Sequence, residues 1–140
     1  MALSARLRQQ VYDRAGGCCE YCRRTVAVRL AKFEIDHIVS LKYGGEDSSD
    51  NLCLTCAPCN RYKGPEVAAV DPLSDAATRL FNPRAQDWRE HFEIHSDGSL
   101  SGLTSEGRAT VAVLRLNEPE RVDQRYGEIR LGNYPCQSNP

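Results

Sequence analysis

The spacing of apolar residues near the N-terminus predicts a helix. Leu3, Leu7 and Val11 recur every four residues, which places them on one helical face. Ser4 is a preferred N-cap residue, and Gly16 is a preferred residue just past a helix end. We therefore expect a helix that begins after Ser4 and stops at Gly16.

A strand is predicted over residues 26–38, where apolar and polar residues alternate in the second half. Glu34 and Asp36 lie on one side of this alternation, and His37 follows directly. Adjacent strand residues point to opposite faces, so Asp36 and His37 share a direction only if the strand is bent or bulged. A Gly-Gly turn at 44–45 and a polar loop come next.

Beyond this strand the pattern predicts mostly helices, with one hairpin. The predicted elements are a short helix over 58–63, a helix from Asp71-Pro72 towards Phe81, a hairpin of residues 88–95 and 100–103, a helix from 104–106, a helix from 117–120 to about Leu131, and a loose tail over 133–140.

Composition narrows the class of protein. The chain has 140 residues and a net charge of -1, and 41% of its residues are hydrophobic, which suits one globular domain or a small domain with an extension. No stretch approaches the roughly 18 apolar residues of a membrane span. The first ten residues lack a signal pattern, so we expect a cytoplasmic protein without a membrane partner. Residues 1–63 hold 10 Lys and Arg against 7 Asp and Glu, an excess that is compatible with a nucleic-acid partner.

Four of the seven cysteines form two Cys-x-x-Cys pairs, Cys19 with Cys22 and Cys56 with Cys59. Structural zinc favours four such ligands in a tetrahedron, so the pairs predict a Zn²⁺ site. Free buried thiols are the alternative, and a redox pair fits less well because neither pair follows a strand in a βαβ unit.

The three remaining cysteines have less distinctive positions. Cys53 lies between two leucines and is most simply a core thiol. Cys18 is an alternative ligand for the first pair, although it breaks the spacing with Cys22. Cys136 lies in the tail that is expected to be loose.

The residues between the cysteine pairs can support phosphodiester hydrolysis. A neutral histidine such as His37 can take a proton from water near physiological pH. Asp36 and Asn60 offer the oxygen ligands that Mg²⁺ prefers, and a divalent ion can stabilise the phosphate and its leaving oxygen. The zinc site formed by the two Cys-x-x-Cys pairs would bring residues 36 and 60 together. The alternative is a histidine at a strand end that is satisfied by a neighbouring carboxylate.

The segment IDHIVSLKYGG, followed by DNL and CAPCNRYKG, resembles the HNH endonuclease family. The resemblance implies that His37 is the general base, that Asp36 and Asn60 are ligands of the catalytic ion, and that Asn51 braces the loop that orients His37. Asn60 stands where the commonest form has histidine, as in the HNN variant. Its amide oxygen favours Mg²⁺ or Mn²⁺ at the catalytic position. The later part of the chain resembles, more loosely, the C-terminal part of bacterial HNH-type proteins.

The resemblance and the pattern together imply an α+β fold. We expect a zinc-stapled ββα-metal unit with an N-terminal helix, in a nuclease domain over residues 1–65. An α+β extension of a hairpin and helices over 66–132 should pack on it, before the loose tail. The expected activity is metal-dependent nicking or cutting of double-stranded DNA with weak sequence preference. The alternatives are an RNA-directed nuclease and a non-catalytic zinc module that binds nucleic acid or a protein partner.

Several further residues have two interpretations. Arg61 and Lys63 either contact phosphates from the short helix or only solvate it. Glu34 is an outer or third metal ligand, or, as we favour, an exposed strand acid. His91 and His95 would share a face of a strand, but no acid or cysteine pattern accompanies them, so we do not favour a further metal site there.

Overall fold

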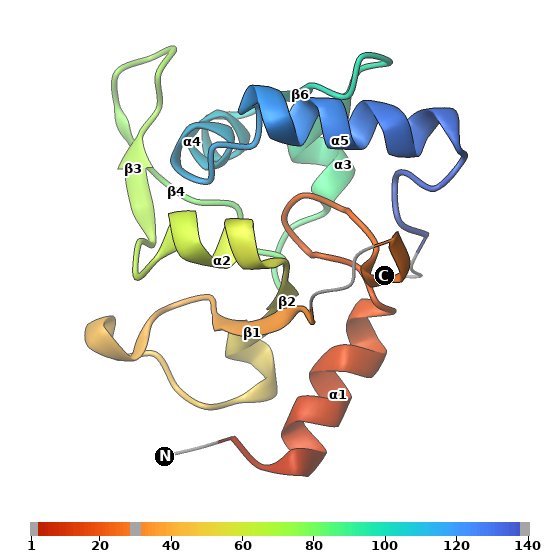
Figure 1. Cartoon of the computed structure of the whole chain (residues 1–140). Helices are drawn as coiled ribbons and strands as arrows, with labels where there is room; N and C mark the ends of the chain where they lie inside the picture. The colour runs from red at the N-terminus through yellow and green to blue at the C-terminus, as the bar shows by residue number, and fades with distance from the viewer. Residues whose placement is uncertain (1–2, 29–31, 138–140) are drawn as a thin grey trace.

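The computed structural model describes residues 3–28 and 32–137. Within these ranges the fold is α+β, with small antiparallel hairpins and five α-helices (Figure 1). The hairpins pair β1 with β2, β3 with β4 and β5 with β6. The elements in chain order are α1 (Ala5–Ala15), β1 (Glu34–His37), β2 (Leu52–Thr55), α2 (Ala57–Lys63), β3 (Ala68–Val70), β4 (Ala77–Arg79), α3 (Trp88–His91), β5 (Phe92–Ile94), β6 (Leu100–Gly102), α4 (Ser105–Val113) and α5 (Pro119–Arg130).

The N-terminal helix is confirmed at both ends. The Ser4 hydroxyl accepts a hydrogen bond from the Leu7 amide at 3.1 Å. Gly16 ends α1 with a φ of 61°, a left-handed conformation that costs glycine no steric strain. Val11 and Ala15 are buried and pack α1 against the β1–β2 hairpin.

The predicted strand over residues 26–38 is too long. Val26–Val28 form a turn of 3₁₀-helix, residues 29–31 lie outside the described residues, and β1 begins only at Glu34. The alternation that predicted the strand belongs to its second half, where β1 pairs antiparallel with β2 and Asp36 lies opposite Cys53. The short helix is confirmed as α2, which follows β2 directly and completes a ββα unit.

The predicted helix from Asp71 to Phe81 is wrong. The segment forms the β3–β4 hairpin, with Asp71 in its turn. The Asp71 carboxylate accepts hydrogen bonds from the Leu73 amide and the Ser74 hydroxyl, and it forms an ion pair with Arg108 at 2.8 Å. An aspartate that bonds nearby backbone stabilises a turn as readily as a helix start, and the distant arginine favours the turn.

The predicted strand over residues 88–95 begins with a helix instead. Asp87 caps α3 by accepting from the Arg89 amide, so the strand starts only at Phe92. The rest of the hairpin is confirmed, since β5 pairs antiparallel with β6. The two later helices are also confirmed: Thr104 caps α4 through the Gly107 amide at 3.1 Å, and Pro119 opens α5.

The described part of the tail is not loose, which corrects the expectation for residues 133–137. Tyr134 is buried, and its hydroxyl donates to the Cys22 carbonyl at 2.7 Å. Cys136 forms a disulfide with Cys18, across 118 residues of sequence. A lone cysteine near a chain end carries no signal of its partner, so the sequence pattern could not locate this link.

The residues after α2 pack on the first part of the chain. An ion pair joins Arg24 to Glu128 of α5, and another joins Glu20 to Arg84. The Trp88 indole donates to the Tyr21 carbonyl at 2.7 Å. All three contacts are made by residues 20–24, in the loop that follows α1. Figure 1 shows this loop between α1 and the later helices α3 and α5. None of the described helices is long and apolar enough to span a bilayer.

Candidate functional site

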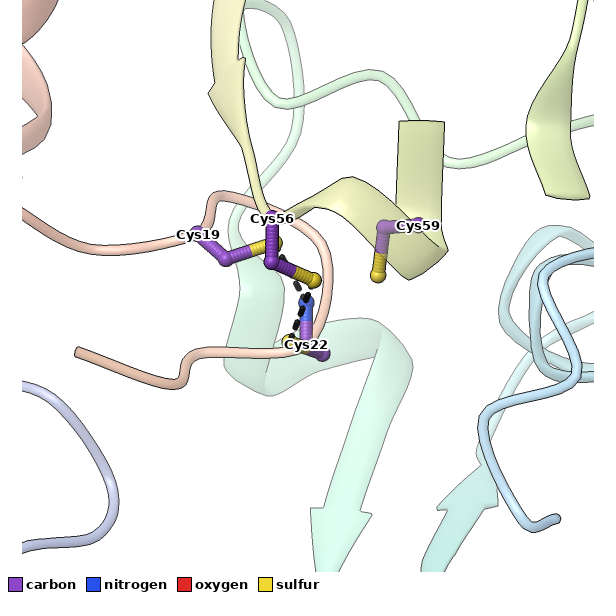
Figure 2. Close-up of side chains that lie close together, drawn as sticks. All are labelled: Cys19, Cys22, Cys56 and Cys59. Carbon is purple, nitrogen blue, oxygen red and sulfur yellow. Dashed lines mark hydrogen bonds between the residues drawn. The ribbon is translucent and has the colours of Figure 1, made fainter. Parts of the chain in front are cut away.

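Four cysteine thiols, from the loop after α1 and from the start of α2, lie close together. The sulfurs of Cys19, Cys22, Cys56 and Cys59 all lie within 4.8 Å of one another, and all four residues are buried. Figure 2 shows two of them on the loop after α1 and two at the junction of β2 and α2. Four sulfurs around zinc at about 2.3 Å are separated by about 3.8 Å. The Cys22 and Cys56 sulfurs are 3.6 Å apart, so the cluster fits a structural zinc ion.

Backbone contacts bring the two cysteine pairs together. The Cys22 amide donates to the Cys19 sulfur at 3.5 Å, which folds the first pair into a tight loop (Figure 2). Glu20 then joins this loop to β2: its amide donates to the Leu54 carbonyl at 2.9 Å, and its carboxylate accepts from the Leu54 amide at 2.8 Å. Because β2 leads directly into Cys56, this pairing places both halves of the cluster side by side.

Arg121 of α5 supplies a positive charge at the cluster. Its guanidinium donates to the Cys59 sulfur at 3.0 Å and to the Leu114 carbonyl at 2.6 Å, and its side chain is buried. Burial alone lowers the pKa of Arg121, but the charge of the neighbouring cysteine sulfurs raises it above its ordinary value. Four thiolates around a divalent ion carry a net charge of -2, which a buried cation partly offsets. The sequence pattern gave no sign of this role.

The cysteines outside the cluster have separate roles. Cys18 is disulfide-bonded, so it is not the alternative zinc ligand that its position allowed. Cys53 is confirmed as a buried core thiol, and burial raises its pKa.

Asp36 faces inward and is paired with a buried lysine. The Lys63 ammonium lies 2.9 Å from the Asp36 carboxylate and donates to the His37 carbonyl at 3.0 Å. Burial raises the pKa of Asp36, while the Lys63 charge acts in the opposite direction. Lys63 is 1% exposed, so its ammonium is not on the surface where a phosphate would approach. This pair ties α2 to β1.

His37 has a different partner from Asp36, as expected of neighbouring strand residues, whose side chains alternate between the two faces. Its Nε2 lies 2.7 Å from a carboxylate oxygen of Asp47, in the loop between β1 and β2. The His37 side chain is 23% exposed, so its ring is accessible to solvent. Asp47 was missed by sequence reasoning; the only signal was its place in an acidic loop ten residues after the histidine.

Asn51 holds the backbone that follows His37. Its side-chain amide exchanges two hydrogen bonds with the backbone of Val39, both at 2.9 Å, and donates to the Glu46 carbonyl. A Cβ atom on Gly45 would lie 1.7 Å from the Val39 carbonyl oxygen and 2.8 Å from the Asn51 amide nitrogen. The close approach of these segments therefore requires glycine at position 45, which explains why a Gly-Gly turn and an asparagine accompany the histidine.

Asn60 and Arg61 lie on α2. The Asn60 amide contacts the carboxylate of Glu34, at the exposed start of β1. Glu34 is exposed, as expected, and lies on the same strand face as Asp36. The Asn60 side chain thus contacts Glu34, whereas the carboxylate of Asp36 is paired with Lys63. Arg61 is exposed, with its guanidinium 5.0 Å from the centre of the Tyr62 ring.

The expected face shared by His91 and His95 does not form. His91 lies in α3 and His95 follows β5, so the two are not on one strand. The His91 ring is bonded to the Thr104 hydroxyl, and the His95 ring to the Ser101 hydroxyl, both at 2.6 Å. Within the described residues, the cluster of four cysteines is the only group of three or more metal-ligating Cys, His, Asp or Glu side chains.

Comparison with known proteins gives one family. The model of the HNH endonuclease family matches residues 19–66, a segment that contains the cysteine cluster, both strands of the first hairpin, and α2. No curated protein matches the chain. The matched segment and the zinc-fitting ββα unit coincide, so residues 19–66 are the part of the chain that is similar to the HNH endonuclease family.

Proposed function

We propose that the protein is a metal-dependent endonuclease that hydrolyses phosphodiester bonds of double-stranded DNA, with weak sequence preference. The observation that carries the proposal is the accessible His37 ring, held by Asp47 on a hairpin that is fastened to a zinc-fitting cluster. HNH endonucleases act on nucleic acids, and the family match covers this whole hairpin. No base-reading helix is recognisable in the sequence, which favours contacts to the backbone over contacts to bases.

His37 is the proposed general base. A carboxylate that accepts from Nε2–H fixes the imidazole tautomer and leaves Nδ1 as the proton acceptor. Asp47 is in position to do this at 2.7 Å. The ring would then take a proton from the attacking water, while Asn51 holds the following backbone in place.

Asn60 and Asp36 are the proposed ligands of a Mg²⁺ or Mn²⁺ ion, with Glu34 as a third oxygen donor. The Asn60 side-chain nitrogen donates to the Glu34 carboxylate, which places α2 beside the start of β1, and hard cations prefer the oxygen donors that these side chains also carry. The bound ion would offset charge on the phosphate and on its leaving oxygen. The Lys63 ammonium neutralises the Asp36 carboxylate in the structure. The proposal therefore requires the carboxylate to bind the ion with one oxygen while the other remains paired with Lys63.

A paired substitution separates the structural role of Asp36 from its proposed role as a ligand. Asp36→Asn alone leaves the Lys63 charge buried without its partner and should destabilise the fold by about 3–5 kcal/mol. Adding Lys63→Gln replaces the ion pair by two neutral amides and should recover most of that stability. The double variant should nevertheless cleave DNA at least about tenfold more slowly, because a metal ligand is lost.

Urea unfolding and initial rates of plasmid nicking measure the two effects, with Lys63→Gln alone as the control that keeps the carboxylate. Recovery of wild-type nicking by the double variant would show that Asp36 acts only through Lys63.

The substrate is tested with plasmid DNA and an RNA of similar length, each incubated with the protein and Mg²⁺ or Mn²⁺. We expect DNA cleavage. Cleavage of RNA alone would select an RNA-directed nuclease. Binding of plasmid without cleavage in either metal would select the non-catalytic zinc module.

A further inference from the structure

A groove rich in arginine runs beside the zinc-fitting cluster. It has a volume of about 840 Å³ and lies between the end of α1, the first cysteine loop and the segment that leads into α3. Its cations are Arg14, Arg23, Arg84 and Arg89, and we call it the arginine groove. These arginines come from three separate segments of sequence, so only the fold brings them together.

Two of the guanidinium groups have capacity for a further acceptor. Arg14 donates to the Ser49 hydroxyl at 2.8 Å and to the Leu52 carbonyl at 2.7 Å, and Arg84 is paired with Glu20. The Nε atoms of Arg14 and Arg84 are nevertheless buried without a hydrogen-bond partner in the described part of the chain. A buried donor without a partner is costly, so both side chains retain hydrogen-bonding capacity that the fold does not use.

The arginines repel one another. Burial, together with the nearby charge of Arg14, lowers the pKa of Arg84 to about 10. A bound anion would relieve this repulsion, because it would lie among charges of the opposite sign.

The acids that line the same groove are Glu20, Asp50 and Asp87. Glu20 is 8% exposed and engaged with the Leu54 amide, and Asp87 caps α3. Two of the three acids are therefore already engaged in hydrogen bonds within the fold. Arg89, by contrast, is exposed to solvent. Asp50 marks the end of the groove that lies next to Asn51.

The groove adjoins the loop that holds the proposed general base. Arg14 bonds Ser49 and Leu52, which bracket Asn51, and Leu52 lies opposite His37 in the β1–β2 register. The same loop carries Asp47, the partner of His37. A polyanion seated in the groove would therefore continue along the loop towards His37.

We propose that the arginine groove binds backbone phosphates of the nucleic-acid substrate, on one side of the bond that is cut. The inference rests on the proposed nuclease function and extends it to a substrate-binding surface outside the residues of the family match, since Arg14, Arg84 and Arg89 lie beyond 19–66. Arginine suits this role because its planar guanidinium forms paired hydrogen bonds with phosphate oxygens.

Binding is tested without cleavage, in a His37→Ala background with no added Mg²⁺. The probe is a fluorescently labelled 20-base-pair duplex, and anisotropy is measured between 50 and 200 mM salt. Arg89→Gln should weaken binding roughly fivefold to tenfold and lower the slope of log K against log salt by about 0.9, the value of one lost phosphate contact. Arg84→Gln should act in the same way, and its amide can still donate to Glu20.

Arg130→Gln is the matched control, because it removes the same charge from an exposed arginine of α5 that does not line the groove. It should leave the affinity unchanged to within about twofold and the slope unaltered. Zinc content and circular dichroism confirm that each variant is folded; Arg89 is exposed, so its replacement removes no buried contact.

The inference would be overturned if His37→Ala alone and His37→Ala combined with Arg89→Gln or Arg84→Gln bound the duplex equally well, whether or not the protein cuts DNA. Weaker binding by these variants would support it even if His37→Ala left cleavage intact, an outcome that would instead contradict the proposed function.

Discussion

Replacing Cys59 by serine is expected to remove bound zinc and to unfold the chain from residue 19 to α2. Binding of a structural zinc ion supplies about 10–16 kcal/mol, whereas the net stability of a domain is about 5–15 kcal/mol. Cys59 is fully buried and is the sulfur to which Arg121 donates. Its loss thus leaves an incomplete site and removes the sulfur nearest to the buried Arg121 cation. Zinc content by mass spectrometry and far-ultraviolet circular dichroism measure the result.

Cys53→Ala is the matched control for that experiment. Cys53 is equally buried and lies in β2, three residues before Cys56, but it is outside the cluster. Its replacement should keep one zinc per chain and cost roughly 1 kcal/mol of stability. A Cys59→Ser protein that is folded and still holds zinc would show that the four sulfurs are not the site.

Replacing His37 by alanine is expected to lower the rate of plasmid nicking by about 10²–10⁴-fold, the usual contribution of a general base. The His37 side chain is partly exposed, and its described side-chain bond is to Asp47. Zinc content and unfolding midpoint should therefore remain close to those of the wild type. Initial rates at saturating Mg²⁺ separate a loss of proton transfer from a loss of metal binding.

His95→Ala serves as the comparison, since His95 is also partly exposed but is bonded to Ser101, in the β5–β6 hairpin. It should nick at the wild-type rate. If His37→Ala and His95→Ala were equally active, the assignment of the general base would be wrong.

The sequence was most informative where spacing alone carries the structure. Two Cys-x-x-Cys pairs predicted the cluster, and Ser4 with Gly16 predicted both ends of α1. A capping residue and a zinc ligand each act through contacts only a few residues apart, so a local pattern is sufficient to find them.

The sequence was misleading where a distant residue decides the outcome. Asp71 followed by proline is typical of a helix start. Arg108, which lies 37 residues later in the sequence, instead holds Asp71 in a turn. Lys63 was a candidate for phosphate contact, and the fold buries it against Asp36. Cys136 lies in a segment predicted to be loose, and its disulfide with Cys18 holds that segment in place. No local pattern carries these pairings.

The central claim is that a zinc-fastened hairpin presents His37 to a phosphodiester bond with the help of a second, divalent ion. The most direct test is the conversion of supercoiled plasmid to nicked circles by the zinc-loaded protein, with and without Mg²⁺, and by the same protein after its zinc has been removed. We predict nicked circles only when both zinc and Mg²⁺ are present. Nicking that is unchanged by removal of zinc, or no nicking by the zinc-loaded protein with Mg²⁺ or Mn²⁺, would contradict the account.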